Sequence, residues 1–160
     1  VCSRLGEMAQ RAMVKLDIPH HRKGVYMAME GPQFSTQAES LFYKNSLGCD
    51  VIGMTNMPEA KLAREAEICY ASIAMVTDFD CWHPDHDSVE VTDIIETLVA
   101  NASTGKAMVK KVMDGMEFGR ELCPHGCDRA LEYAIISNPD HIPAPEKERL
   151  GIIAKRVLEK

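Results

Sequence analysis

The chain has 160 residues, of which 46% are hydrophobic and 26% are charged, and its formal net charge is −6 at pH 7. Such a composition is typical of a folded globular domain. The acidic balance, without a Lys/Arg-dense patch, argues against a nucleic-acid-binding protein. Apolar runs stay well short of the ~20 residues of a membrane span, and the first residues show no signal-peptide pattern. We therefore expect a cytoplasmic protein that binds a small molecule and neither nucleic acid nor a membrane.

The first part of the chain predicts a helix followed by a strand. Apolar residues recur at helical spacing on one face, which indicates an amphipathic helix packed on a sheet; they are Leu5, Met8, Ala9, Ala12, Met13 and Leu16. Pro19 and Gly24 close the connection, and residues 25–29 then read as a strand.

The segment after this strand predicts a sharp turn and a helix start. Glu30-Gly31-Pro32 breaks the chain, and Thr36 with Glu39 three residues later has the form of a capping box. Phe34 and Ser35 fall at the junction, where an aromatic side chain can face a ligand. From the residues alone, Phe34 is better explained as core or as a staple to its own helix. A role of Ser35 as a helix-start residue is compatible with either interpretation.

Two apolar runs, 50–54 and 70–76, flank a helical stretch that contains Leu62, Ala63 and Ala66. This order predicts a βαβ unit with parallel strands, the second covered on both faces. Ligands bind beyond the carboxyl ends of such strands. The residues found there are Met54 and Thr55 at the end of the first run, and Thr77, Asp78 and Asp80 after the second. Without further information, an Asp at this position is more often a turn residue.

The rest of the chain predicts a loop and helices. Residues 82–92 are polar and rich in His and Asp, which favours a mobile lid over the sheet edge and not a metal cluster. A long helix follows from Thr92, and a short helix is expected over 130–136. A terminal helix over 146–158 carries an apolar stripe that indicates an interface if it is exposed: Leu150, Ile153, Ala154 and Val157.

Six cysteines stand mostly beside or within apolar segments, where buried reduced thiols are the default in a cytosolic protein. Cys123 and Cys127 differ, because only a Pro, a His and a Gly separate them. These residues with His125 are a weak zinc signal, since a second, distant pair of ligands is not evident. A local disulfide or plain thiols are both favoured over a metal.

Four strings resemble the S-methyl-5′-thioadenosine phosphorylases of the trimeric purine nucleoside phosphorylase superfamily: 30–39, 53–59, 63–71 and 77–82. The resemblance covers residues 1 to about 116. It implies an α/β fold with a mixed, largely parallel twisted β-sheet flanked by helices, of which this chain represents the C-terminal half. On this basis, residues 1–118 belong to the phosphorylase domain and 119–160 form its helical extension.

The resemblance implies a purine pocket specific for adenine. In it, Phe34 stacks on the base, Thr77 lines the pocket, and Ser35 stands where 6-oxopurine enzymes typically carry a Glu. Asp78 is the catalytic acid that protonates N7 of the leaving adenine, and Asp80 accepts a hydrogen bond from its 6-amino group. A second carboxylate so close would also raise the affinity of Asp78 for a proton.

The same resemblance implies the remaining contacts. Met54 lies against the ribose, Val91 and Ile94 surround the 5′-methylthio group, and Thr55 contributes to the phosphate site. From the residues alone, helix-start packing explains Val91 and Ile94 nearly as well. Inorganic phosphate is a co-substrate, and neither a cofactor nor a metal is expected.

Family members are about twice this long, and their first half carries a Gly-rich loop and an Arg-His pair that hold phosphate. Neither element has a match here. The resemblance implies a homotrimer or an assembly with an N-terminal-half chain. The expected reaction is phosphorolysis of 5′-methylthioadenosine. Two alternatives stay open: a broader purine nucleoside phosphorylase, and a non-catalytic nucleoside-binding homologue or subunit.

Overall fold

The computed structural model describes residues 1–84, 91–116 and 122–158. It divides into two compact units. The first unit comprises residues 1–5, 57–71 and 118–160, and the second comprises residues 6–56 and 72–117.

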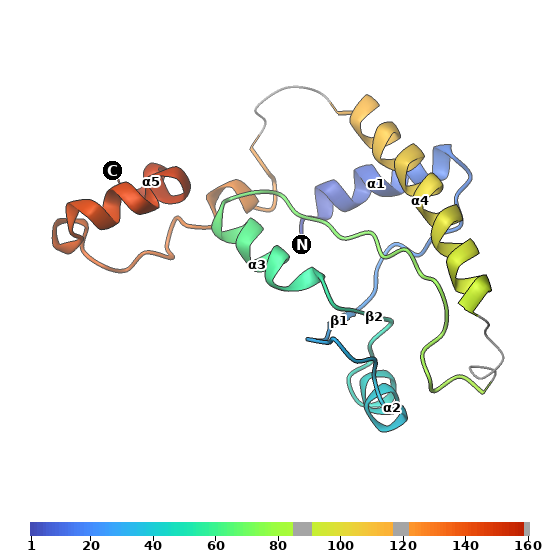
Figure 1. Cartoon of the computed structure of the whole chain (residues 1–160). Coiled ribbons are helices and arrows are strands. Elements are labelled where there is room, and N and C mark those ends of the chain that lie inside the picture. The colour runs from blue at the N-terminus through green and yellow to red at the C-terminus, as the bar shows by residue number, and fades with distance from the viewer. Residues whose placement is uncertain (85–90, 117–121, 159–160) are drawn as a thin grey trace. The chain divides into compact units, whose positions relative to one another are not determined.

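The second unit contains a parallel pair of strands joined through a helix (Figure 1). The strands are β1 (Tyr26–Ala28) and β2 (Val51–Gly53), and the helix between them is α2 (Gln37–Asn45). Tyr26 pairs with Val51 and Ala28 with Gly53. The strands expected at 25–29 and 50–54 are therefore confirmed, as is an α/β fold with a parallel sheet.

Hydrogen bonds and one glycine fix the register of this pair. The Val25 N–H donates to Asp50 Oδ2 at 2.7 Å, and the Met29 N–H donates to the Gly53 carbonyl at 3.0 Å. At Gly53 the Tyr26 ring occupies the space that a side chain would need, because a Cβ there would overlap the Tyr26 hydroxyl and lie 2.6 Å from its Cζ. Position 53 must therefore be glycine if the Tyr26 ring keeps its place.

Gly53→Ala is expected to lower the free energy of unfolding by about 1–3 kcal/mol, because the Tyr26 ring must move to admit the new methyl group. Urea unfolding followed by circular dichroism measures this change. The matched control is Gly151→Ala, where an added Cβ meets no atom within 4 Å. This helical position should gain up to about 1 kcal/mol. Equal effects at the two glycines would contradict the packing described here.

Two helices accompany the strands. Helix α1 spans Ser3–Lys15 and buries Ala9 and Ala12, as its apolar spacing predicts. Helix α4 spans Val91–Asp114 and packs along residues 72–76. At Gly105 an added Cβ would lie 3.0 Å from Met75 Sδ, and the Asn101 side chain donates to the Val76 carbonyl at 2.9 Å. Gly105 therefore serves the contact between α4 and this segment.

The prediction of a strand over residues 70–76 is wrong, since this stretch forms neither strand nor helix. The βαβ unit expected from the runs 50–54 and 70–76 is therefore wrong as well, because β2 pairs with β1 instead. Its apolar character satisfied the sequence pattern, but a strand also needs a neighbour that takes up its backbone hydrogen bonds. The Tyr70 carbonyl accepts instead from the Cys2 N–H at 2.6 Å, and the Val76 carbonyl accepts from Asn101. The side chains of Ile73, Met75 and Val76 are exposed.

The first unit is helical around a core of cysteines. Its elements are α3 (Asn56–Glu65, whose first residue belongs to the second unit), the short 3-10 helices η2 (Cys127–Arg129) and η3 (Pro139–His141), and α5 (Ala144–Leu158). Cys2, Cys123 and Cys127 are buried together, with Leu5 and Cys69 packed against them. Small side chains thus make up much of the interior of this unit.

Charged hydrogen bonds hold α5 within the first unit. Arg156 donates to Glu67 at 2.5 and 2.8 Å and to Glu132 at 2.8 Å. The Arg156 guanidinium holds the pKa of the Glu67 carboxyl below its ordinary value. These bonds connect three segments that are distant in sequence, so they set the position of the C-terminal helix in its unit.

The tail differs from its prediction in two places. The terminal helix is confirmed, but the helix expected over 130–136 is wrong, because most of that stretch forms turns. The apolar stripe of α5 is only partly available as an interface, since Ala154 is buried whereas Ile153 is exposed. Within the described residues, no helix is both long and apolar enough to cross a membrane.

Candidate functional site

The predicted site residues begin where the two parallel strands end. Phe34 and Ser35 lie between β1 and α2, and Met54 and Thr55 follow β2 directly. Because β1 and β2 run parallel, their carboxyl ends lie at the same edge of the sheet. That edge is where a ligand site is expected in an open α/β sheet.

Met54 lies against the turn that follows β1. A Cβ placed on Gly31 would meet the Met54 Sδ at 2.6 Å, and Gly31 adopts a φ of 70°. Glycine satisfies both demands, since it has no side chain and tolerates a left-handed backbone. The Ser35 hydroxyl donates to the Met29 Sδ at 3.6 Å, which connects the far end of the turn to β1. Sequence reasoning noted the break at Gly31 but not its contact with Met54.

A third segment, residues 77–83, joins this edge through Cys81. The Cys81 thiol donates to the Ser35 carbonyl at 3.4 Å. Nearby, the Lys44 Nζ of α2 lies 2.8 Å from the centroid of the Trp82 ring, a cation–π contact. These two contacts place the residues around Asp80 beside the start and end of α2. Cys81 was missed as a positioning residue because nothing local in the sequence reports a contact with Ser35.

Aromatic rings stabilise the turn that carries the two aspartates. Phe79 stacks on His83 with centroids 4.4 Å apart and an interplanar angle of 15°. Trp82 meets Phe79 edge-on at 5.9 Å. The His83 N–H also donates to the Asp80 carbonyl at 3.0 Å, which closes the turn. The backbone after Asp78 is thus held by ring contacts and by a hydrogen bond.

The two aspartates have different surroundings. Asp80 accepts from the Cys81 N–H through Oδ1 at 2.9 Å, whereas its Oδ2 is buried and finds no hydrogen-bond partner in the described part of the chain. Asp78 is exposed, and its Oδ1 accepts from the Thr77 hydroxyl at 2.7 Å. A buried carboxylate oxygen without a donor is costly. Asp80 Oδ2 is therefore an acceptor whose hydrogen-bonding capacity the described residues leave unused.

The helix next to Ser35 begins with the expected capping box. The Thr36 N–H donates to Glu39 at 2.7 Å, and the Glu39 N–H donates to the Thr36 hydroxyl at 3.3 Å. The Thr36 backbone N–H, followed by its hydroxyl, holds the pKa of Glu39 below its ordinary value. This cap fixes the backbone directly after Ser35.

The other predicted site residues are exposed, half-buried or only partly described. Phe34 is 85% exposed, and Thr55 is also exposed. Ile94 is half-buried in the first turns of α4, and Val91 begins that helix, although its side chain lies outside the described residues. Most of the expected lid over 82–92 lies outside them as well.

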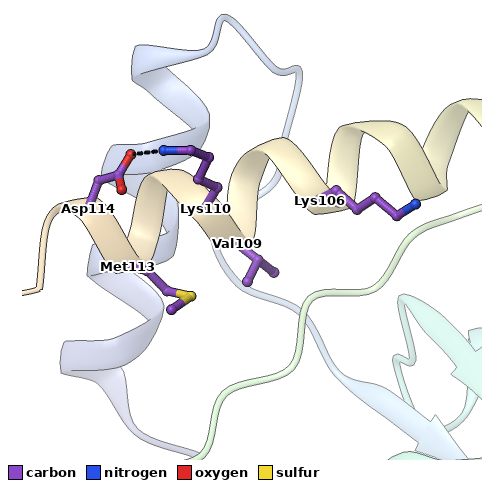
Figure 2. A pocket seen from close by; sticks show the side chains of 6 residues that line it. Lys106, Val109, Lys110, Met113 and Asp114 are labelled. Atoms are coloured by element: carbon purple, nitrogen blue, oxygen red, sulfur yellow. Dashed lines mark hydrogen bonds and ion pairs between the residues drawn. The ribbon is translucent and has the colours of Figure 1, made fainter.

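A surface hollow of about 570 Å³ lies elsewhere, along α4. Figure 2 shows Val109 and Met113 on one side of this helix and an ion pair between Lys110 and Asp114, whose Nζ and Oδ2 are 2.8 Å apart. One helix supplies all of its lining, and none of the predicted site residues is among them. We therefore do not assign the nucleoside site to this hollow.

Comparison with known proteins identifies relatives over nearly the whole chain. Residues 1–114 match the family model of the phosphorylase superfamily. An S-methyl-5′-thioadenosine phosphorylase of Cereibacter sphaeroides is 52% identical over 158 residues, which cover 99% of this chain and 54% of the relative. The chain thus spans about half the length of the curated relatives it matches.

Two solved structures share the fold. A methylthioadenosine phosphorylase from an Antarctic soil metagenomic library has a TM-score of 0.86 and 39% identity, and the match covers 96% of this chain and 53% of that one. A methylthioadenosine phosphorylase from Schistosoma mansoni in complex with adenine has a TM-score of 0.65 and 30% identity, covering 74% and 48%. Because the family model matches residues 1–114 and a relative is 52% identical along 99% of the chain, this chain belongs to the phosphorylase superfamily.

Proposed function

We propose that residues 1–160 supply the adenine and sugar pocket of an enzyme that phosphorolyses 5′-methylthioadenosine to adenine and 5-methylthioribose 1-phosphate. The observation that carries this proposal is the 52% identity, along 99% of this chain, to an S-methyl-5′-thioadenosine phosphorylase. The geometry of the carboxylates adds chemical support, because Asp78 and Asp80 bring two carboxyl groups to one turn.

In this proposal Asp80 recognises the base as a 6-aminopurine. Its buried Oδ2 lacks a partner in the described residues. An ionised carboxylate accepts hydrogen bonds but cannot donate them. The 6-amino group of adenine donates such a bond, whereas the 6-oxo group of hypoxanthine presents another acceptor. A site of this kind rejects the wrong purine because its own buried oxygen stays unpaired.

Asp78 supplies the proton that makes adenine a better leaving group. As a phosphate oxygen bonds to C1′, the bond between C1′ and N9 breaks and its electron pair goes to the purine. The Asp78 carboxylic acid transfers its proton to N7 at this stage. The Thr77 hydroxyl donates to Asp78 Oδ1, which leaves Oδ2 to carry the proton toward the base.

The remaining residues hold the sugar and the phosphate. Met54 packs against the ribose, and Val91 with Ile94 surrounds the 5′-methylthio group, where desolvation favours a thioether over a hydroxyl. Thr55 contributes to phosphate binding. The other phosphate ligands belong to the half of the relatives' length that residues 1–160 do not cover.

We also propose that the working enzyme is a cytoplasmic homotrimer. The second unit leaves large apolar side chains exposed on α4, among them Ile95, Leu98 and Val99. Exposed apolar faces of this kind favour cover by further protein. That cover includes the phosphate-binding half, whether it is supplied on the same polypeptide or as a second one. We call residues 1–160 together with that half the complete enzyme.

A phosphorolysis assay on the complete enzyme tests this proposal. Adenine release from 5′-methylthioadenosine should require inorganic phosphate, and phosphorus NMR should detect a sugar 1-phosphate. The value of kcat/KM should exceed that for inosine by about 10²-fold or more. Equal values for the two nucleosides would instead indicate a broad purine nucleoside phosphorylase, and binding without turnover would indicate a non-catalytic homologue.

A further inference from the structure

Four of the six cysteines meet in the first unit. The Sγ atoms of Cys2, Cys69, Cys123 and Cys127 all lie within 4.8 Å of one another. They come from the N-terminal residues, from the segment after α3 and from the turn that leads into η2. The C-x3-C pair judged a weak zinc signal from its sequence therefore has the second, distant pair of ligands that it lacked.

The spacing of the sulfurs matches one shared metal ion. Zinc binds thiolates at about 2.3 Å in a tetrahedron, which places the sulfurs about 3.8 Å apart. The Sγ atoms of Cys2 and Cys123 are 3.7 Å apart, and all four cysteines are free thiols. A polynuclear iron–sulfur cluster would hold its cysteine sulfurs farther apart, because irons and sulfides lie between them.

The turn from Cys123 to Cys127 brings two cysteine sulfurs close enough to bind one metal ion. Its C-x3-C spacing lies within the range of zinc-binding cysteine pairs. Gly126 adopts a φ of 67°, and its N–H donates to the Cys123 carbonyl at 2.9 Å. This hydrogen bond closes the turn and holds the two cysteines at a short spacing.

The surroundings suit a charged metal–thiolate group. One zinc ion and four thiolates carry a net charge of −2, and the Arg4 guanidinium lies 3.9 Å from the Cys69 Sγ. Cys2 and Cys123 are each 1% exposed, so water has little access to these two sulfurs. Besides three of the cysteines, the buried apolar side chains among the described residues of the first unit are Ala154 and Leu158. So small a core commonly relies on a metal or on disulfides.

We propose that Cys2, Cys69, Cys123 and Cys127 bind one zinc ion in a closed tetrahedral site that fastens the C-terminal segment to the N-terminal residues and to the end of α3. Four thiols each lose a proton to solvent as four zinc–sulfur bonds form, and nothing is oxidised or reduced. Four protein ligands leave zinc without an open position, so the site is structural and not catalytic.

Metal analysis of the full chain, purified under reducing conditions and incubated with zinc alone, tests the proposal. We expect about one tightly bound zinc ion per chain by mass spectrometry of the metal content. Cobalt(II) in place of zinc should give the intense visible bands of a tetrahedral thiolate site. A chain that retains neither metal, or a cobalt spectrum typical of octahedral oxygen ligands, would overturn the proposal.

Two substitutions with a matched control identify the ligands. Cys2→Ser and Cys127→Ser should each reduce bound zinc from about one to below about 0.2 per chain, because a closed four-cysteine site loses a ligand. Cys49→Ser changes a cysteine outside the cluster and should leave the zinc content unchanged. If a variant fails to fold, the cobalt spectrum of the unsubstituted chain still decides the question.

Thiol oxidation is the main competing outcome. Alkylation followed by peptide mass spectrometry counts the free thiols of the chain as isolated. Disulfides among the four cysteines in the chain as isolated, together with failure to bind zinc after reduction, would contradict a metal site. None of these measurements uses a nucleoside, so their outcome is independent of the proposed enzymatic activity.

Discussion

Asp78→Ala in the complete enzyme is expected to lower both kcat and kcat/KM for 5′-methylthioadenosine by about 10²–10⁴-fold, the usual scale of general acid catalysis. The physical reason is that the adenine anion is a poor leaving group until N7 gains a proton. The donor is placed on an exposed turn and is oriented by the Thr77 hydroxyl. Steady-state kinetics at saturating phosphate measures the effect.

The kinetic pattern separates an acid from a binding residue. A rise in KM with kcat unchanged would contradict the role of Asp78, because it would mark an interaction made equally in the ground state and the transition state. Asp140→Ala is the matched control, since it removes an exposed aspartate of η3 that is outside the predicted site. Its kinetic constants should equal those of the unsubstituted enzyme. Urea unfolding should show similar stability for both variants, because neither side chain is buried.

Asp80→Asn is expected to reduce the preference for 5′-methylthioadenosine over 5′-methylthioinosine by about 10- to 100-fold, the scale of a hydrogen bond to a charged group. The amide oxygen can still accept from the Cys81 N–H, which is 2.9 Å from Oδ1. The amide nitrogen then replaces the buried oxygen that has no partner in the described residues. A donor at this point opposes the 6-amino group of adenine and complements the 6-oxo group of hypoxanthine.

The two substrates differ only in the purine, so the ratio of their kcat/KM values isolates base recognition. The KM for phosphate should stay unchanged, which separates this effect from general damage to the site. A variant that loses activity equally toward both nucleosides would contradict the assignment of Asp80 to the 6-amino group.

Local patterns in the sequence predicted local structure well. The capping box of Thr36 and Glu39 forms as expected, and strands form within 25–29 and 50–54. Each of these features depends on residues within a short stretch or on a simple apolar run. The segment 70–76 has the same apolar character and yet forms no strand. Its structure depends on hydrogen-bond partners that the pattern of the segment does not contain.

Contacts between distant segments could not be predicted in the same way. Cys81 bonds to the Ser35 carbonyl, and Cys2 lies beside Cys123, which is 121 positions away in the sequence. Such proximity follows from the path of the whole chain, so cysteine spacing alone reported only the pair at Cys123 and Cys127. The division into residues 1–118 and 119–160 and the roles of the site residues stay predictions.

A crystal structure of the complete enzyme with adenine and phosphate tests the central claim most directly. We predict that N7 of adenine lies within hydrogen-bonding distance of Asp78 and that its 6-amino group donates to Asp80 Oδ2. The Phe34 ring should lie on the face of the base, and the phosphate should contact Thr55. Adenine bound without contact to Asp78 or Asp80 would contradict the proposed pocket.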